Sequence, residues 1–409
     1  MVDARDRDTF SLDHIENRDM KVLIFTTQLY KLGGAERLAV ELAEELAKRP
    51  EIEVDVLCQG PEGEPRSGVV HDRLVRAGVR SVRFLGRPFR SGAKAFIPTL
   101  HRLRRVIKEG NYDIVETSLP GPRIFTAFAT VGLAVRHVAG IHDCYDGLRK
   151  GIGAKLDRWV SSINRNTAYY AISQEAALAW ERFSGVGRER IRTIYNSIHQ
   201  SYFSASQSKK PVCAEFGLNT KLPLLLFVGR LTLRKGLDVL VEGVCPLAES
   251  GEVSLLLVGA PNTAIEPSFG ETPGFLERLQ SRLSGCSNIH MTGFRDDVPR
   301  LMGAADILVH PARHEAFGLV LAEAMSCSLP IVTTNVGGIL EVVEGTDTIC
   351  LPAGNPDALK DGIERILRRT DEEKKQCRDK AYKRAKFFRT SRRADEMLSY
   401  FQSLLSKRS

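Results

Sequence analysis

The sequence contains no apolar stretch long enough to cross a bilayer, which takes about 18 residues. The nearest candidate, residues 124–135, is closed by Arg136 and His137, so we expect a buried helix there. Residues 1–19 carry charges of both signs and lack the apolar core of a signal peptide. We therefore expect a flexible N-terminal extension at 1–19 and a cytoplasmic protein.

Motifs for disulfides and metals are also missing. The cysteines form no Cys-x-x-Cys pair, no histidines cluster at metal-ligand spacing, and no Asp-x-Asp pair ends a predicted strand. Scattered thiols of this kind are typical of a reduced protein. We predict no structural zinc and no metal or other cofactor. The cysteines are Cys58, Cys144, Cys213, Cys245, Cys286, Cys327, Cys350 and Cys377.

The composition is that of an ordinary globular protein. Hydrophobic residues make up 43% and charged residues 26% of the chain, which excludes a disordered or fibrous class. A chain of 409 residues is long for one hydrophobic core, so two domains are expected.

The net charge of +8 is unevenly spread, because residues 76–108 contain no Asp or Glu. A solvated helix face is the ordinary explanation. An anionic membrane surface or a lipid-diphosphate acceptor is the sharper alternative, since each nearby Lys or Arg contributes about 1 kcal/mol. Nucleic acid would fit the charge, but no recognition motif accompanies it, so we predict no such partner. The basic residues are Arg76, Arg80, Arg83, Arg87, Arg90, Lys94, Arg102, Arg104, Arg105 and Lys108, and a second cluster is Arg149, Lys150, Lys155, Arg158 and Arg165.

The most informative stretch is DILVHPARHEAFGLVLAEAMSCSLPIVTTNVGG, residues 306–338. Its pattern predicts a buried strand at 307–309, a loop that holds Glu315, a helix from Gly318 and a second strand at 331–334. These pieces form a right-handed βαβ unit. Ligands of such sheets bind at the carboxyl ends of the strands, so Glu315 lies at a candidate site.

The residue types in this stretch suit a phosphorylated sugar ligand. Backbone N–H groups of Phe317, Gly318 and Leu319 lie at the start of the predicted helix, which favours a phosphate or diphosphate. Glu315 and Glu323 would instead accept hydrogen bonds from sugar or ribose hydroxyls. The alternative is that Glu323 is a solvated helix residue and Glu315 a loop charge.

This stretch closely resembles the E-x7-E segment of retaining nucleotide-sugar glycosyltransferases of family 4, with every point of the pattern present. The resemblance implies the GT-B fold, an α/β fold of two Rossmann-like domains that face a central cleft. In this family the C-terminal domain holds the nucleotide and the N-terminal domain presents the acceptor. By resemblance, Glu323 binds the ribose hydroxyls and Glu315 lies beside the transferred sugar.

Two earlier segments support the resemblance. A strand at 22–25 leads into Gly33 and Gly34 and then into a helix, an arrangement that lets the backbone approach a phosphate. It resembles the family's GG-x-E loop, which faces the donor diphosphate. His142 ends another predicted strand, where a lone histidine is more often structural; family members hold a His there, often followed by Asp, that contacts the transferred sugar. We assign His142 to the site.

The second half of the chain supplies cations and the nucleobase site. FVGRL-x-x-x-KG resembles the family signature in which Arg230 and Lys235 neutralise the diphosphate, so no metal is then needed. Charged residues at a strand end suit that task because charge-assisted hydrogen bonds are strong. Relatives hold the nucleobase near Phe294 and Arg295, largely through backbone groups.

We predict an extension at 1–19, an acceptor domain at 20–203, a donor domain at 204–386 and a last helix at 387–409 that returns to the first domain. The predicted activity is transfer of a sugar, with retention, from a nucleoside-diphosphate sugar to a hydroxyl acceptor that could be lipid-linked. Polysaccharide, lipopolysaccharide or glycolipid assembly would suit it, with peripheral membrane contact through 76–108 as an open alternative. A same-fold epimerase or phosphorolytic enzyme, a non-catalytic nucleotide-sugar-binding subunit and a nucleic-acid-binding protein are the rival interpretations.

Overall fold

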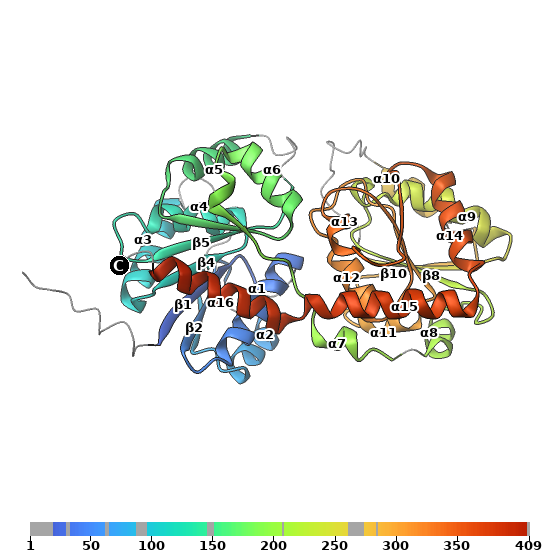
Figure 1. Ribbon diagram of the computed structural model, residues 1–409, viewed down its shortest axis with the longest axis horizontal. Coiled ribbons are helices and arrows are strands. Elements are labelled where there is room, and N and C mark those ends of the chain that lie inside the picture. Colours follow the sequence, from blue (N-terminus) through green and yellow to red (C-terminus); the bar gives the residue numbers. More distant parts are fainter. Residues whose placement is uncertain are drawn as a thin grey trace, which may run out of the picture. The chain divides into compact units, whose positions relative to one another are not determined.

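The protein is described from a computed structural model, which covers residues 19–29, 33–61, 65–86, 96–144, 151–206, 208–260, 274–283 and 285–406. The chain divides into two compact units, residues 1–139 with 401–409 and residues 140–400. Figure 1 shows the helices and strands along the chain. The predicted extension, except Asp19, and most of the loop at 260–274 lie outside the described residues. The predicted domain boundaries stay a prediction.

The strands form two sheets. Neighbours in the first follow the order β3-β2-β1-β4-β5-β6-β7, and those in the second the order β10-β9-β8-β11-β12-β13. Every strand pair whose register is defined is parallel. The first sheet contains β1 (Met20–Thr26), β2 (Ile52–Cys58), β3 (Ser81–Phe84), β4 (Ile114–Thr117), β5 (Arg136–Ile141), β6 (Thr167–Ala171) and β7 (Ile191–Thr193). The second contains β8 (Leu224–Val228), β9 (Ser254–Val258), β10 (Ile289–Gly293), β11 (Ile307–His310), β12 (Ile331–Thr334) and β13 (Ile349–Leu351).

Helices connect successive strands, as parallel pairing requires. Those up to residue 215 are α1 (Gly34–Ala47), α2 (Pro65–Arg76), α3 (Phe96–Gly110), α4 (Pro120–Ala129), α5 (Ile152–Ile163), α6 (Gln174–Ser184), α7 (Gln200–Phe203) and α8 (Lys209–Glu215). The later ones are α9 (Leu237–Glu249), α10 (Phe275–Leu283), α11 (Val298–Ala304), α12 (Leu319–Ser326), α13 (Ile339–Val342), α14 (Pro356–Leu367), α15 (Asp371–Ala385) and α16 (Thr390–Ser406). Short 3-10 turns are η3 (Arg188–Arg190), η4 (Leu233–Lys235) and η6 (Lys386–Phe388).

Strand β8, in the interior of the second sheet, is apolar along its whole length, as expected of a parallel strand with both faces covered. In β8 the run Leu224, Leu225, Leu226 and Phe227 is fully buried. Successive side chains of a strand point to opposite faces, and Leu225 and Phe227 join one hydrophobic cluster with α9, α10 and α14. This pattern explains why the sequence shows continuous apolar runs here instead of an alternation.

The strand order places the candidate site. In the second sheet the order reverses between β8 and β11, and such a switch point leaves a crevice at the carboxyl ends of the two strands. The segment that contains Arg230 follows β8, and the segment that contains Glu315 follows β11. The two parallel sheets confirm the predicted α/β class with two Rossmann-like domains.

Two local predictions were wrong. The glycines and prolines of residues 60–68 predict a loop from the sequence, but α2 begins at Pro65, a residue whose fixed φ angle suits the first helical position. The buried helix expected at 124–135 is α4, which runs from Pro120 to Ala129. Val131 beyond it is 63% exposed, so the apolar pattern extended past the helix end.

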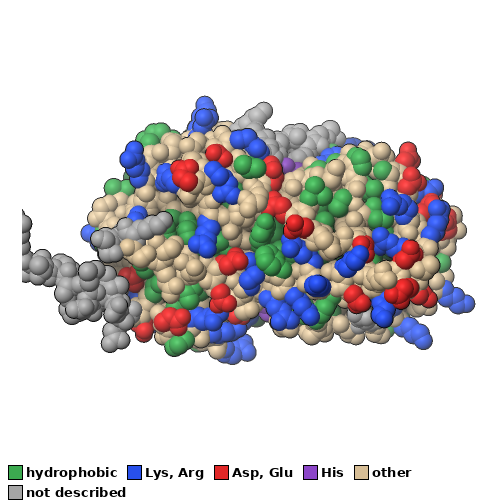
Figure 2. All heavy atoms as spheres, viewed as in Figure 1, with side chains coloured by type: hydrophobic (Ala, Val, Ile, Leu, Met, Phe, Trp, Pro, Cys, Tyr) green, Lys and Arg blue, Asp and Glu red, His purple; other side chains and the backbone are tan. Residues whose placement is uncertain are grey.

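The basic residues of 76–108 are partly engaged with the protein itself. Arg80 forms ion pairs with Asp55 and Glu53, and Arg104 donates to the carbonyls of Ala129 and Val131 at 2.7 Å each. Lys and Arg side chains are interspersed with Asp and Glu on the face shown in Figure 2. Arg87, Arg90 and Lys94 lie outside the described residues. A search of the described helices finds none with the length and apolarity of a bilayer span.

The last helix contacts the first sheet. The Tyr400 hydroxyl in α16 donates to the Tyr169 carbonyl in β6 at 2.9 Å. Arg192 lies over the Tyr400 ring, 5.5 Å from its centroid. Residues 401–409, beyond this contact, belong to the first unit.

The turn between η4 and α9 requires a glycine, and this generates a stability prediction. Gly236 has φ of 71°, and a Cβ there would lie 1.8 Å from the Pro311 carbonyl oxygen. Gly251 has a similar φ of 74° with open space around it. We expect Gly236→Ala to lower the free energy of unfolding by more than about 1 kcal/mol beyond the effect of Gly251→Ala. Urea denaturation of both variants measures this, and equal losses would show that the close approach to Pro311 has no energetic weight.

Candidate active site

The residues predicted as catalytic all lie in the second unit. Arg230 and Lys235 follow β8, Glu315 follows β11, and His142 follows β5. Parallel strands end at the same edge of their sheet, so the loops after β8 and β11 meet. The backbone N–H of Arg313 donates to the Arg234 carbonyl at 2.9 Å, which ties these two loops together.

Lys235 and Glu315 form the central contact of the site. The Lys235 ammonium lies 2.5 Å from Glu315 Oε2, and the two side chains are only 17% and 15% exposed. His310 Nε2, at the end of β11, lies 3.1 Å from the same carboxylate oxygen. The structure therefore joins two residues that the sequence assigned separately, and adds a histidine that it did not assign.

The protonation states follow from burial and from these partners. Burial raises the pKa of Glu315, but the Lys235 charge and the His310 hydrogen bond outweigh it and hold the pKa well below its ordinary value. Burial lowers the pKa of His310, although its bond to Glu315 acts in the opposite direction. Glu315 is therefore ionised and His310 neutral near pH 7.

The tautomer of His310 follows from its partner. A carboxylate has no proton to donate, so Nε2 carries the hydrogen and donates it to Glu315. Nδ1 is then an acceptor, and it is buried without a hydrogen-bond partner among the described residues. The Phe227 ring lies nearly parallel to the imidazole at 6.5 Å between centroids, so His310 is fixed on one side by the apolar core.

His142 lies at the end of β5, as predicted, beside a second ion pair. Its Nε2 is 3.5 Å from the Tyr170 hydroxyl, and its ring meets that of Tyr170 edge to face. The neighbouring Asp143 accepts a 2.7 Å hydrogen bond from Arg234. Burial raises the pKa of Asp143, but His314 and Arg234 outweigh it and lower the pKa to about 2. Arg234, the residue before Lys235, is therefore the ion-pair partner of Asp143.

Arg230 lies at the end of β8 with an exposed side chain. Its carbonyl accepts from the Thr232 N–H at 3.0 Å, which begins the tight turn toward Lys235. Two cationic residues therefore follow β8. Arg230 is exposed, and Lys235 is paired with Glu315.

The start of α12 offers backbone donors to a ligand. Gly318, the residue before the helix, has φ of 87°, and no described side chain caps the helix. The Phe317 side chain is buried, with its ring 5.5 Å from that of Phe388, so only its backbone can take part. The N–H groups of Phe317, Gly318 and Leu319 lie at this uncapped end, where the helix dipole favours an anion.

Glu323 is buried within α12 and only 4% exposed. The alternative that it is a solvated helix residue is therefore wrong. Its carbonyl accepts a 2.6 Å hydrogen bond from the Ser326 hydroxyl. Burial removes this carboxylate from bulk water, and its role toward a ribose hydroxyl stays a prediction.

Further contacts fix the backbone of the Glu315 loop. Gly338 donates its N–H to the Glu315 carbonyl at 3.1 Å. The Ser173 hydroxyl, which precedes α6, donates to the Ala316 carbonyl at 2.6 Å. The carbonyls of Glu315 and Ala316 are therefore both hydrogen-bonded within the protein.

The remaining predicted donor residues have different environments. Phe294 follows β10 and is 57% exposed. Arg295 is held by Asp297 at 2.7 Å and by Glu215 at 2.9 Å, and it lies over the Phe216 ring. Its guanidinium is therefore engaged with the protein, which leaves backbone groups for a ligand, as the sequence suggested.

Gly33 and Gly34 belong to the first unit. Gly33 precedes α1 in an extended conformation, and no described side chain caps that helix. The Thr27 hydroxyl donates to Glu36 at 2.9 Å, which joins the end of β1 to the first turn of α1. Residues 30–32, just before Gly33, lie outside the described residues, so the approach of this turn to a phosphate stays a prediction.

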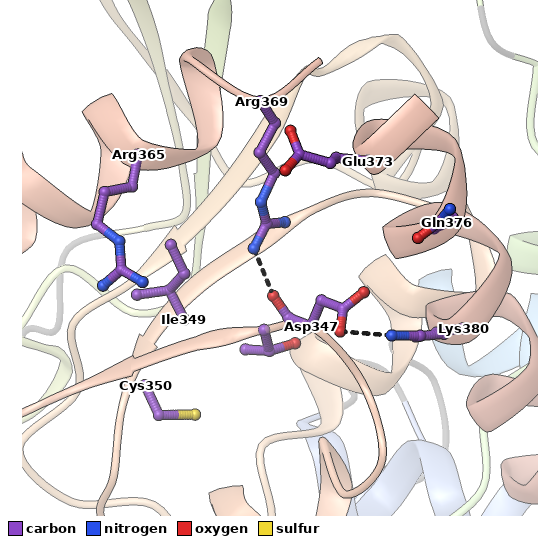
Figure 3. A pocket seen from close by; sticks show the side chains of 9 residues that line it. Asp347, Ile349, Cys350, Arg365, Arg369, Glu373, Gln376 and Lys380 are labelled. Carbon is purple, nitrogen blue, oxygen red and sulfur yellow. Dashed lines mark hydrogen bonds and ion pairs between the residues drawn. The ribbon is translucent and has the colours of Figure 1, made fainter. Parts of the chain in front are cut away.

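A pocket of about 500 Å³ also exists beside β13, α14 and α15 (Figure 3). Lys380 there lies 2.8 Å from the Asp347 carboxylate, and Arg369 donates to the Asp347 carbonyl at 2.9 Å. Its polar groups thus satisfy one another, and none of the predicted site residues lines it. Its lining is Asp347, Thr348, Ile349, Cys350, Arg365, Arg369, Glu373, Gln376 and Lys380.

His310, Arg234 and His314 were missed by the sequence analysis, and Asp143 was noted only as the residue that follows His142. His310 had one usable signal, since it ends a predicted strand at the carboxyl edge where ligands bind. Arg234 had no such signal, because the sequence pattern alone does not distinguish it from Arg230 and Lys235 in the same short segment.

We expect the coupling free energy between Lys235 and Glu315 to be independent of pH near neutrality. Because the folded-state pKa of Glu315 is lowered, its contribution to stability is fully present above the ordinary value of 4.5 and is lost only as pH falls through the folded pKa. A double-mutant cycle of Lys235→Met and Glu315→Gln in urea should give a coupling of about 1–3 kcal/mol, equal at pH 7 and pH 5.

The exposed pair Arg368–Glu364 provides the matched control for this cycle. A surface pair of this kind should couple by less than about 1 kcal/mol. A Lys235–Glu315 coupling that declines between pH 7 and pH 5 would contradict the assignment, because burial would then control the protonation of Glu315.

Two family models match the chain. Residues 32–202 match the model described as Glycosyltransferase Family 4, and residues 209–384 match Glycosyl transferases group 1. An uncharacterized glycosyltransferase of Methanocaldococcus jannaschii is 26% identical, covering 82% of this chain and 85% of its own. The lipopolysaccharide glucosyltransferase WaaG of Escherichia coli is 39% identical over 30% of each chain.

Solved structures share the fold. Anabaena HepE in complex with UDP and glucose superposes with a TM-score of 0.77 at 21% identity, covering 94% of this chain and all of the other. WaaG, described as involved in lipopolysaccharide biosynthesis, gives a TM-score of 0.69 at 22% identity, covering 93% and 99%. These neighbours confirm the predicted GT-B fold. Since the two models match most of both halves of the chain, it belongs to the group 1 glycosyltransferases of family 4.

Proposed function

We propose that this chain transfers a hexose from a nucleoside-diphosphate sugar to a hydroxyl acceptor, with retention of configuration and without a metal. The contact that carries the proposal is the Lys235–Glu315 pair beside the uncapped start of α12. A cation, a sugar-facing carboxylate and open backbone donors at one switch point are what a glycosyl diphosphate needs. The HepE structures, which hold UDP or UDP-glucose, support a donor of this class.

The leaving group sets the largest electrostatic demand. As the anomeric C–O bond breaks, negative charge develops on the diphosphate, and preorganised cations and dipoles stabilise it. Lys235, Arg230 and the N–H groups before α12 would supply them. No cofactor takes part in the proposed chemistry.

Glu315 and His142 would orient the sugar. An ionised Glu315 accepts hydrogen bonds from sugar hydroxyls and, next to Lys235, stays ionised while it does so. We do not assign it as a nucleophile. The acceptor oxygen would instead attack the anomeric carbon from the face that the diphosphate leaves, and the departing phosphate oxygen would take the acceptor proton. These steps balance charge without a covalent enzyme intermediate.

Glu323 would anchor the nucleotide. The buried Glu323 carboxylate would accept hydrogen bonds from the two hydroxyls of a ribose diol. The backbone near Phe294 and Arg295 would then receive the nucleobase, as family resemblance suggests.

The acceptor class is proposed from the relatives. WaaG acts on lipopolysaccharide, and a Mycobacterium tuberculosis relative, 26% identical over 58% of this chain and 59% of its own, is named a GDP-mannose-dependent phosphatidylinositol dimannoside mannosyltransferase. We propose a lipid- or polysaccharide-linked hydroxyl acceptor. A same-fold epimerase is the second candidate and would convert the donor sugar with no acceptor present.

Donor binding should depend on Lys235 and Glu323. Each charge-assisted bond contributes about 1.5–3 kcal/mol, so Lys235→Ala and Glu323→Ala should each weaken nucleoside-diphosphate-sugar binding by about tenfold to a hundredfold. Calorimetric titration measures this, with the exposed Lys210→Ala and Glu242→Ala as matched controls. Parent-like affinity in either site variant would contradict the donor assignment.

Binding should also be independent of metal and select one donor. In 5 mM EDTA, a panel of nucleoside diphosphates and their sugars at about 100 times Kd should raise stability by about 2.7 kcal/mol for the true donor. Thermal denaturation provides the measurement. Loss of the response in EDTA would refute metal independence, and conversion of the donor sugar without acceptor would favour the epimerase.

A further inference from the structure

Helix α5 (Ile152–Ile163) turns an unusual face toward the protein. It contacts α6, and its buried residues are Asp157, Val160 and Ser161. A surface helix normally buries its apolar stripe and exposes its polar one. Here a carboxylate and a hydroxyl are among the residues turned inward.

The outward face of α5 is apolar. Ile152, Trp159 and Ile163 are 87%, 53% and 56% exposed. At 3.6 residues per turn, these positions fall within roughly 40° of one another around the helix axis. The half-buried Leu156 lies in the same stripe. A large aromatic side chain and two isoleucines therefore form one line along the exposed side of the helix.

Cations flank this stripe. Lys155 and Arg158 are exposed, and Arg165 is exposed just beyond the helix. The acidic residue of α5, Asp157, is only 2% exposed and faces inward. The outer surface of the helix thus combines apolar side chains with positive charge and has no carboxylate.

We propose that α5 docks this protein on an anionic lipid surface. A helix of this composition lies in the plane of the membrane, with its apolar stripe at the boundary of headgroups and acyl chains. Ile152, Trp159 and Ile163 enter this boundary, and Lys155 and Arg158 meet headgroup phosphates. The inference goes beyond the transfer reaction and does not depend on which donor or acceptor is used.

The charge favours lipid over a second copy of the chain. A twofold contact through α5 would place each face against its own equivalent. Lys155 and Arg158 of both copies would then share one interface with no exposed α5 carboxylate to pair with them, which is unfavourable. An anionic lipid surface meets the cations and the apolar stripe together.

Intrinsic fluorescence provides a direct test, since the chain contains two tryptophans. Trp180 is fully buried, so a change on vesicle addition reports Trp159. With the full chain, vesicles of phosphatidylcholine containing phosphatidylglycerol should shift the emission to the blue and co-sediment the protein. Pure phosphatidylcholine vesicles should bind far less, and salt should weaken the binding.

Variants separate the stripe from the charges. Trp159→Ser and Ile163→Ser should each weaken vesicle binding by about tenfold, and Lys155→Ala and Arg158→Ala by about fivefold each. Val131→Ser, at an exposed apolar residue outside α5, should have no effect. The five substituted side chains are all exposed. The variants should therefore keep the parent circular dichroism spectrum and thermal stability.

Three outcomes would overturn the proposal. The first is no binding to anionic vesicles, and the second is parent-like binding by a Trp159→Ser, Ile163→Ser double variant. The third is concentration-dependent self-association that this double variant abolishes while vesicles remain unbound, which would assign the face to a second copy.

Discussion

The ion pair between Lys235 and Glu315 is the constraint on which the site depends. A buried carboxylate is costly without a partner, and here the partner comes from a loop that follows a different strand. The pairing requires the two loops to approach closely, which explains the glycine at 236 beneath the Pro311 carbonyl. It also keeps Glu315 ionised, the state in which it can accept hydrogen bonds from a sugar.

The order of the second sheet makes this approach possible. Because β8 and β11 are neighbours although β9 and β10 intervene in the sequence, the strand order reverses at their carboxyl ends, where ligands of such sheets bind. Lys235 and Glu315 extend from those two ends, and α12 begins beside them. The apolar runs of both strands fix the sheet, so the chemistry occupies loops that the core holds in place.

The sequence predicted the sheet type and placed Glu315 and Lys235 after strand ends, because apolar runs and loop residues are local signals. The individual roles of Glu315, Glu323 and Lys235 came from the family resemblance and stay predictions. Partner choice was not predictable in this way. That Lys235 bonds to Glu315, that Arg234 bonds to Asp143, and that Arg295 is held by Asp297 and Glu215 depend on loops meeting across the fold. The same holds for Arg80, whose charge counted toward a basic surface but is paired with Asp55.

The central claim is that a nucleoside-diphosphate sugar binds at the carboxyl ends of β8 and β11. Hydrogen–deuterium exchange of the full chain, with and without its selected donor, tests it most directly. The account predicts slower exchange at residues 229–237 and 313–323, with residues 347–380 beside the pocket of Figure 3 unchanged. Protection confined to residues 347–380, or none in either region, would contradict it.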